Sequence, residues 1–431
     1  MRTAIAEQVP QSVSLHAETP WAARFAQRMQ RASGSAVREL LKLTARPEVI
    51  SFAGGLPAPE AFPMAAIERA TRRVLEHDGA AALQYGVTEG YRPLREMLAR
   101  HMRRYGIGAT CDNVLVTTGS QQGLDLVARL LLNPGDRVLT EAPTFLGAIQ
   151  AFRACQAEFL TVPVDDDGLR VDLLEEALRA GPKLMYVLPN FQNPTGVTLS
   201  QERRMQLVER ASRYGVPILE DDPYGQLRYE GKHLTPLIVL DARYHGARPG
   251  GGLRGDVLYL GTLSKTLAPG LRIGWVVAPQ ELIDKLVILK QGCDLHTSSF
   301  CQHVAYEAAR GGFLDSHVRV IRRMYGERRD AMLQALERHF PASARWTHPQ
   351  GGLFLWVTLP PGIDSAELLQ EALAQDVAFV PGRACFPDGG GQETLRLNFS
   401  FMPPERIEEG IRRLGGLFRQ RLHGTGTPGQ A

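Results

Sequence analysis

The sequence predicts an α/β protein with a large domain, built on a mostly parallel sheet flanked by helices, and a smaller α+β domain. The 431 residues correspond to two or three domains at roughly 150 residues each. From about residue 64 to residue 300, short apolar runs alternate with polar loops and helical periodicity, which is typical of βα units. Beyond residue 301 we expect an amphipathic helix, a hairpin and a strand, at Arg319–Phe340, Gly351–Val357 and Leu395–Phe399.

This organisation has four expected segments. Residues 1–63 form an N-terminal arm and a mobile helix that joins the small domain, and residues 64–300 form the large domain. Residues 301–421 form the small domain, and residues 422–431, rich in Gly, Thr and Pro, form a flexible tail. The arm helix is expected to begin near Ser35, which can cap it.

Six apolar runs in the large domain have the length of buried strands. Polar loops rich in Gly, Pro and Asn follow five of these runs, and in open α/β sheets ligands bind beyond the carboxyl ends of the strands. We therefore expect the five loops to meet at one site. The six runs are Val114–Val116, Arg137–Leu139, Leu184–Leu188, Val216–Leu219, Val257–Leu260 and Ile273–Val277.

Charge and composition exclude several classes of protein. With 49 Lys and Arg against 46 Asp and Glu, the net charge of +3 does not favour a nucleic-acid partner. No stretch approaches the roughly 18 apolar residues that a membrane span needs, and no secretory signal is visible before Pro20. Five cysteines without a CxxC pair argue against a disulfide framework, so we expect a cytoplasmic protein.

The side chains at the strand ends suit pyridoxal phosphate (PLP). The ε-amine of Lys265 can form an imine with the cofactor aldehyde and then serve as a base. Asp221, at the end of a buried run, can keep the pyridine nitrogen protonated. The helix that opens at Gly119-Ser120 offers unpaired N–H groups to a phosphate, and Arg272 supplies a guanidinium fork for the same anion.

Several short motifs occur in an order that resembles the fold-type I PLP-dependent aminotransferases, closest to the 2-aminoadipate and kynurenine aminotransferase subgroup. The resemblance covers residues 38–399 and makes residues 64–300 the PLP-binding domain. Each motif is weak alone, but their order is specific. They are Ser51-Phe52-Ala53-Gly54-Gly55-Leu56-Pro57, Gln84-Tyr85-Gly86, Gly119-Ser120-Gln121-Gln122, Asn193-Pro194-Thr195-Gly196, Asp221-Asp222-Pro223-Tyr224, Ser264-Lys265 and Gly270-Leu271-Arg272.

The resemblance implies a role for each cofactor residue. Lys265 resembles the Schiff-base lysine, which also moves the proton, and Asp221 matches the partner of the pyridine nitrogen. Tyr224 and Asn193 match the groups that bind the phenolic oxygen, and Phe145 matches the aromatic that stacks on the ring. Tyr85 matches a tyrosine that reaches the phosphate of the other subunit, which implies a homodimer with composite sites. The implied phosphate-binding group is Ser120, Gln121, Thr262 and Arg272, and Ser264 is a further implied cofactor-binding residue.

The resemblance also implies how substrate is held. Arg396 matches the arginine that binds the α-carboxylate, with help from Asn193. Gly54 and Gly55 lie at the substrate-side joint, where small residues let backbone approach a ligand. Arg38, on the mobile helix, matches an arginine that meets the distal carboxylate of acidic substrates, and withdrawal of that helix implies broad specificity.

The implied activity is transfer of the amino group of an L-amino acid to a 2-oxo acid such as 2-oxoglutarate. The donor is expected to be 2-aminoadipate or a broad set of acidic, aromatic and branched amino acids. One alternative is a PLP-dependent lyase or decarboxylase on the same scaffold. Another is an aminotransferase-like effector domain of a transcriptional regulator, which needs roughly a further domain before Arg38, where the sequence has a short arm.

Two other patterns fail their context tests. The segment Gly250–Gly255 satisfies GxGxxG but precedes a strand, whereas a dinucleotide-binding loop follows one. Cys293, His296, Cys301 and His303 do not have a zinc-site spacing, so we expect no metal.

Overall fold

The computed structural model describes residues 21–30, 46–248 and 251–424. The expected arm helix, Arg38 and residues 425–431 of the expected tail lie outside the described residues. In the described part, no helix has both the length and the apolar character that crossing a membrane requires. No group of three or more His, Cys, Asp or Glu side chains in that part is placed to hold a metal ion.

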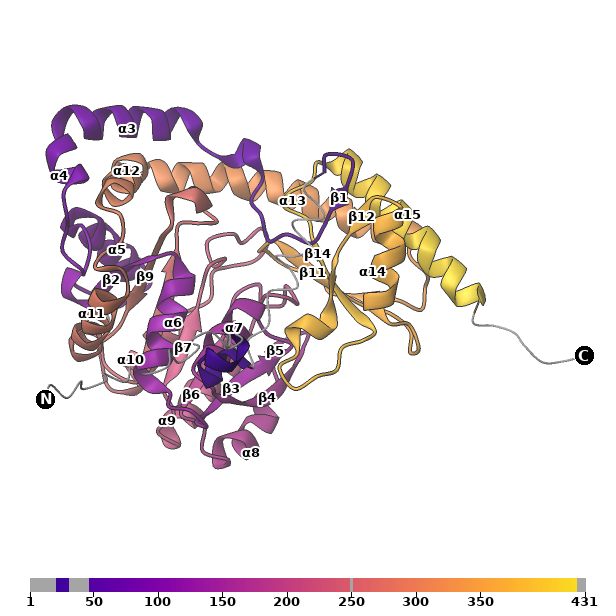
Figure 1. Ribbon diagram of the computed structural model, residues 1–431, viewed down its shortest axis with the longest axis horizontal. Helices are drawn as coiled ribbons and strands as arrows, with labels where there is room; N and C mark the ends of the chain where they lie inside the picture. The colour runs from indigo at the N-terminus through magenta and orange to yellow at the C-terminus, as the bar shows by residue number, and fades with distance from the viewer. Residues whose placement is uncertain (1–20, 31–45, 249–250, 425–431) are drawn as a thin grey trace, which may run out of the picture.

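An eight-stranded sheet forms the centre of the larger half of the molecule (Figure 1). Its order is β2-β9-β8-β7-β6-β3-β4-β5, with β9 antiparallel to both of its neighbours and β5 antiparallel to β4. The other pairs are parallel, which confirms the predicted α/β class. The strands are β2 (Val114–Thr118), β3 (Arg137–Ala142), β4 (Glu158–Asp165), β5 (Gly168–Leu169), β6 (Leu184–Val187), β7 (Ile218–Asp221), β8 (Val257–Thr262) and β9 (Ile273–Val277).

All six predicted strands are present, and the sheet contains two more. β4 lies next to the edge of the sheet, is only partly buried and includes Pro163. Proline cannot donate to the ladder of hydrogen bonds, and Thr161 and Pro163 interrupt the apolar residues of this strand, so no continuous apolar run marks it. β5 has two residues, which is too short for a periodicity to show.

Alternate side chains of the strands enter two different cores, because successive residues of a strand point to opposite faces. Val114 and Val116 pack in one core, and Leu115 packs in the other. Both faces are therefore covered by helices, as a parallel sheet requires. The first face is covered by α3 (Met64–His77), α4 (Gly79–Leu83), α5 (Arg92–Arg104), α8 (Leu174–Arg179), α9 (Gln201–Arg213), α10 (Leu237–Tyr244) and α12 (Ser299–Ala309). The second face is covered by α6 (Ser120–Leu131), α7 (Leu146–Ala154) and α11 (Gln280–Asp294).

The smaller half contains a third core and two small sheets. An antiparallel sheet of order β10-β11-β14-β13 lies beside the parallel pair β1-β12. The strands are β1 (Ile50–Ser51), β10 (Arg345–Trp346), β11 (Phe354–Thr358), β12 (Val377–Ala378), β13 (Val380–Pro381) and β14 (Thr394–Asn398), and the helices are α14 (Ser365–Ala374) and α15 (Pro404–Gly424). The short helix α1 (Gln27–Gln30) is not part of either half's sheets and lies against α7 (Figure 1).

The helix α13 (Phe313–His339) connects the two halves. Its residues Ile321 and Tyr325 are buried in the second core of the large sheet, while Met332 and Leu336 are buried in the core of the small sheets. The predicted amphipathic helix is the greater part of α13. The predicted domain bounds stay predictions, because the halves share this helix.

Candidate active site

Lys265 follows β8, in one of the loops predicted to form the site. Its Nζ donates a 2.7 Å hydrogen bond to the carbonyl oxygen of Gly55. Burial, with smaller contributions from the cations Arg396 and Arg272, lowers the pKa of Lys265 to about 8. At pH 7 roughly a tenth of such an amine is neutral, far more than for an ordinary lysine with a pKa of about 10.4, and the neutral form is the one that acts as a nucleophile or base.

Asp221 ends β7 and is 2% exposed. Its Oδ2 accepts a 2.8 Å hydrogen bond from the hydroxyl of Tyr186, whereas its buried Oδ1 has no hydrogen-bond partner. Burial raises the pKa of Asp221 to about 7, the Tyr186 hydrogen bond opposes that rise, and the charge of Asp222 adds to it. A buried acceptor without a partner is uncommon, so Oδ1 is placed to receive an N–H group from a ligand.

Arg396 lies on β14 of the small sheet and is buried. It donates from Nη1 to Oδ1 of Asn193 at 2.7 Å and from Nη2 to the carbonyl oxygen of Ala53 at 2.6 Å. Its guanidinium lies over the ring of Phe354, 4.2 Å from the centroid. Burial lowers the pKa of Arg396, and its buried Nε has no partner. No described carboxylate neutralises this buried cation, so it can bind an anionic ligand.

The segment that precedes the short 3-10 helix η2 (Pro59–Ala61) brings Arg396 and Lys265 together. Ala53 and Gly55, two residues apart, supply the carbonyl oxygens that accept from Arg396 and Lys265. A Cβ on Gly55 would lie 3.0 Å from Cζ of Phe354, which is tighter than ordinary van der Waals contact. Gly54 is buried between these two residues. The amine of Lys265 and the guanidinium of Arg396, both predicted site residues, therefore bind the same short backbone segment.

Tyr224 and Asn193 complete the buried part of the site. Tyr224 is 4% exposed and meets the ring of Phe354 edge-on, with centroids 5.9 Å apart. Burial raises the pKa of Tyr224, and Asn193 forms a hydrogen bond with it that acts in the opposite direction. The phenol therefore stays protonated at neutral pH and can donate a hydrogen bond.

The amino end of α6 forms a second group of predicted residues. Gly119, with φ of 74°, precedes Ser120, the first residue of α6. A Cβ on Gly119 would collide with the guanidinium of Arg272, and one on Gly274 would collide with the backbone at Gly119 and Ser120. The chain therefore needs glycine at both positions to bring an exposed arginine against a helix amino end. Free N–H groups and a nearby guanidinium form a site for an anion such as phosphate.

The remaining cofactor candidates border this helix end. Thr262 accepts a 3.1 Å hydrogen bond from the backbone N–H of Ser264 and donates to the carbonyl oxygen of Ile273 at 3.0 Å. Gln121 donates to the carbonyl oxygen of Gly147 at 2.8 Å. A Cβ on Gly147 would meet both the Gln121 amide and the ring of Phe145, so these two side chains lie close together.

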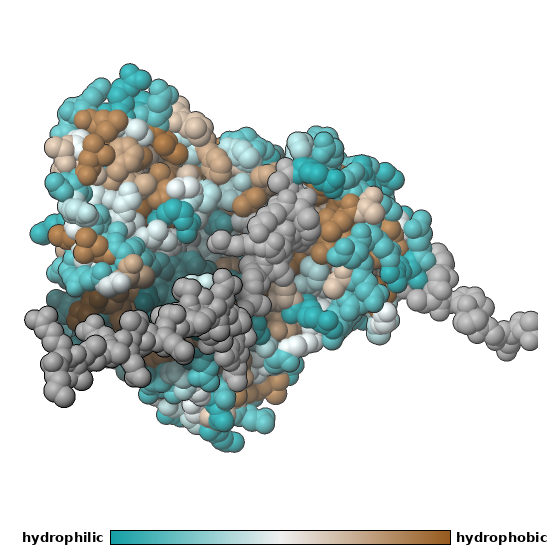
Figure 2. Space-filling view, in the orientation of Figure 1, coloured by the Kyte–Doolittle hydropathy of each residue, from teal (hydrophilic) through white to brown (hydrophobic). Residues whose placement is uncertain are grey.

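Tyr85 lies outside this group. It is 79% exposed, and its ring meets His296 edge-on with centroids 5.8 Å apart. Its neighbours Leu83 and Val87 are 71% and 61% exposed, and Figure 2 shows hydrophobic side chains at the surface around α3 and α4. Exposed apolar patches of this kind mark contact surfaces. Arg38, the predicted specificity residue, is outside the described residues.

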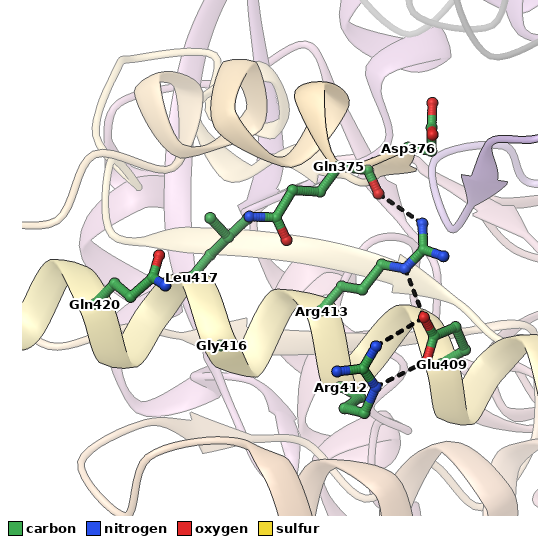
Figure 3. A pocket seen from close by; sticks show the side chains of 8 residues that line it. All are labelled: Gln375, Asp376, Glu409, Arg412, Arg413, Gly416, Leu417 and Gln420. Carbon is green, nitrogen blue, oxygen red and sulfur yellow. Dashed lines mark hydrogen bonds and ion pairs between the residues drawn. The ribbon is translucent and has the colours of Figure 1, made fainter.

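A surface pocket on the small half is a weaker candidate. It has a volume of about 480 Å³ and is lined by Gln375 and Asp376, which follow α14, and by residues of α15 (Figure 3). Its arginines Arg412 and Arg413 both bind Glu409, through hydrogen bonds of 2.7 to 2.8 Å. Because these charges satisfy one another, the pocket does not offer the unpaired groups that the strand-end site has.

Two residues of the site were missed by the sequence analysis. Tyr186 lies inside an apolar strand, and nothing in the run distinguishes a tyrosine that binds an aspartate from one that fills the core. Phe354 belongs to the predicted hairpin, but only the fold brings its ring under Arg396. The repeated glycines Gly351 and Gly352, whose added Cβ atoms would collide with Phe191, are the one signal that this turn is tightly packed.

Comparison with known proteins identifies the family. Residues 48–414 match the family model "Aminotransferase class I and II". Aromatic-amino-acid aminotransferase 1 of Thermococcus litoralis is 47% identical over 92% of this chain and 94% of that protein. The 2-aminoadipate transaminase of Thermus thermophilus is 46% identical over 92% and 96%. The crystal structure of LysN, the α-aminoadipate aminotransferase of Thermus thermophilus, complexed with N-(5'-phosphopyridoxyl)-L-leucine, matches with a TM-score of 0.87 at 42% identity over 94% and 100%.

The described residues fit the cofactor of this family, PLP. Asp221 has a buried oxygen without a partner, as a ring N–H needs. Arg272 and the amino end of α6 suit a phosphate, and the amine of Lys265 has a lowered pKa.

The order of the motifs, the fold and the site geometry therefore agree with the family match. The relatives named above are all aminotransferases. The chain is also similar to the HTH-type transcriptional regulator YisV of Bacillus subtilis, at 31% identity over 92% of this chain and 80% of that protein. This chain belongs to the aminotransferase class I and II family, and it is a PLP-dependent aminotransferase that acts on amino acids and 2-oxo acids.

Proposed function

We propose that the protein transfers the α-amino group of 2-aminoadipate, or of a broad set of acidic, aromatic and branched L-amino acids, to 2-oxoglutarate. The observation that carries this proposal is the pairing of Lys265 and Arg396 on the carbonyl oxygens of Gly55 and Ala53. This arrangement places Lys265, which can carry a proton, near the guanidinium of Arg396, which can bind a carboxylate. The names of the relatives, an aromatic-amino-acid and a 2-aminoadipate enzyme, support aromatic and acidic donors.

In this proposal Arg396 binds the α-carboxylate of the substrate, and Asn193 holds the guanidinium in the required orientation. Bound PLP supplies a ring that stabilises negative charge at the substrate Cα. Lys265 would remove the proton from the substrate Cα and hold it at Nζ, because its lowered pKa leaves some of the amine neutral. The buried ring of Phe354 excludes water from the guanidinium.

The remaining residues hold the cofactor. Asp221 binds the ring nitrogen, while Tyr224 and Asn193 bind the phenolic oxygen and Phe145 covers the ring. The phosphate is bound at the amino end of α6, where backbone N–H groups and a cation are concentrated. The phosphate residues of the proposal are Ser120, Gln121, Thr262, Ser264 and Arg272.

We further propose that the enzyme is a cytoplasmic homodimer in which Tyr85 of one copy completes the site of the other. The exposure of Tyr85 between Leu83 and Val87 supports a covered surface there, and the five free thiols suit a reducing compartment. The test is the solution mass together with mixing of two inactive variants, Tyr85→Ala and Lys265→Ala. Partial activity of the mixture is expected, and an inactive mixture that still forms mixed dimers would contradict shared sites.

The substrate proposal is tested with purified protein, PLP and single amino donors. Formation of glutamate from 2-oxoglutarate by acidic, aromatic and branched donors is expected, with Lys265→Ala inactive and the surface variant Lys183→Ala normal. Release of CO2 or ammonia without need of a 2-oxo acid would instead indicate a decarboxylase or lyase. We assign Arg38 to acidic donors, so Arg38→Ala should weaken 2-aminoadipate far more than phenylalanine.

A further inference from the structure

Tyr186 and Asp221 meet inside the large sheet through the register of two neighbouring parallel strands. Tyr186 of β6 is paired with Leu219 of β7, so Asp221, two residues further, points to the same face of the sheet. The hydroxyl of Tyr186 donates to Oδ2 of Asp221 at 2.8 Å. The two residues are 0% and 2% exposed, so water does not compete for this hydrogen bond.

The ring of Tyr186 is held in place by its surroundings. Phe152 of α7 meets it edge-on, with centroids 5.6 Å apart and the planes at 71°. A phenol has one O–H to donate, and here the donation goes to Oδ2 while Oδ1 is left without a partner. One carboxylate oxygen is thus tied to the sheet and the other stays available.

We propose that Tyr186 is a positioning residue that favours the ionised form of Asp221 and leaves Oδ1 as the oxygen that binds the ring nitrogen of PLP. This inference rests on the proposed function of Asp221 as the cofactor's partner. It assigns a role to a residue that touches neither substrate nor cofactor in the proposal above. Tyr186 acts by fixing which oxygen faces the ligand and in which charge state.

The charges around the pair explain why such a donor matters. Asp222, next in the chain, disfavours a second negative charge, and burial does the same. Glu141 and Tyr224 are the other titratable groups near Tyr186, and neither is a cation. The Tyr186 hydrogen bond is the one contribution that favours the ionised form of Asp221. Without it, the pKa of Asp221 would rise further, and a smaller fraction of Asp221 would carry the negative charge that binds a protonated ring nitrogen.

The experiment compares Tyr186→Phe with the matched variant Tyr259→Phe. Tyr259 of β8 is also buried, and its hydroxyl donates to Oδ2 of Asp222 at 3.0 Å. Each variant therefore removes one buried hydroxyl from one of two adjacent aspartates. Thermal unfolding of both apoproteins measures the shared structural cost, and equilibrium binding of PLP to each apoprotein measures the effect on the cofactor.

We expect Tyr186→Phe to weaken PLP binding about tenfold or more at pH 7.5, as loss of a hydrogen bond to a charged group does, while Tyr259→Phe binds PLP as the parent does. The acid limb of the kcat profile should move to higher pH in Tyr186→Phe only, with KM for the amino donor little changed. In an Asp221→Asn background, Tyr186→Phe should cause no further loss of PLP affinity.

Equal PLP affinities and equal pH profiles for the two tyrosine variants would overturn the inference, as would an undiminished effect of Tyr186→Phe in the Asp221→Asn background. These outcomes are separate from a failure of the proposed function. If the parent protein turned over no amino donor, the substrate proposal would fall, while the PLP affinities would still decide the role of Tyr186.

Discussion

The guanidinium of Arg396 donates a 2.7 Å hydrogen bond to the side-chain oxygen of Asn193, which links β14 of the small sheet to the loop after β6. This contact joins residues 203 positions apart in the sequence. It means that the group proposed to bind the substrate carboxylate is oriented by a residue proposed to bind the cofactor. Binding of the one ligand is therefore coupled to the placement of the other.

Arg396→Lys should raise KM for every amino donor and lower kcat/KM about 10- to 100-fold, since an ammonium cannot replace two parallel hydrogen bonds to a carboxylate. Steady-state kinetics with 2-aminoadipate, phenylalanine and leucine measure this. The surface variant Arg345→Lys is the control. A loss restricted to 2-aminoadipate would instead place Arg396 at the distal carboxylate.

The reactivity of Lys265 should follow its lowered pKa. In the apoprotein, pH-dependent acylation followed by mass spectrometry should give a midpoint near 8 for Lys265, well below the value of about 10.4 for lysine in a model peptide. Because the charge of Arg396 lowers the pKa of Lys265, Arg396→Gln should move the Lys265 midpoint upward. An unchanged midpoint in that variant would show that the charge of Arg396 does not contribute to the lowered pKa of Lys265.

Gly119→Ala should cost both stability and cofactor affinity. Gly119 has φ of 74°, and an added Cβ would collide with the guanidinium of Arg272. The matched control is Gly135→Ala, with φ of 86° and no atom within 4 Å of the new Cβ, which should lose only about 1 kcal/mol of unfolding free energy from backbone strain. Gly119→Ala should lose more and should bind PLP less tightly. Denaturant unfolding and PLP titration of both apoproteins test this.

Buried Glu141 should make stability depend on pH. Its Oε2 accepts a 3.0 Å hydrogen bond from the backbone N–H of Leu188, yet burial raises the pKa of Glu141 to about 8. Between its ordinary pKa of about 4.3 and 8, the folded protein holds more protons than the unfolded chain. Stability is therefore lost as pH rises through this range, by at most about 1.4 kcal/mol for each pH unit.

Glu141→Gln removes that titration. In apoproteins, the unfolding free energy of Glu141→Gln minus that of the parent should therefore increase from pH 5 to pH 8. Urea unfolding at several pH values measures it. The buried carboxyl of Glu220, whose pKa is raised to about 7, titrates in both proteins and cancels from the difference. A difference that is constant with pH would mean that Glu141 stays charged.

The sequence predicts the loops of the site because strand ends are marked by local features. Lys265, Asp221 and Asn193 each follow an apolar run, and a parallel sheet then brings those ends to one edge. Tyr186 could not be predicted in the same way, because its contact with Asp221 depends on the register of β6 against β7. Phe354 depends on how the small sheet meets the large one, which no local pattern encodes.

The helix α13 has a mechanical consequence for this site. Its 27 residues form a rod of roughly 40 Å at 1.5 Å per residue, and its middle and its carboxyl-terminal part are buried in different cores. Sliding of one core past the other would expose buried side chains of α13, such as Tyr325 or Met332, to solvent. Relative movement of Arg396 and Lys265 is therefore restricted to rotation about this rod or bending along it, and a tilt of roughly 5° at Tyr325 would displace the far end by only about 2 Å.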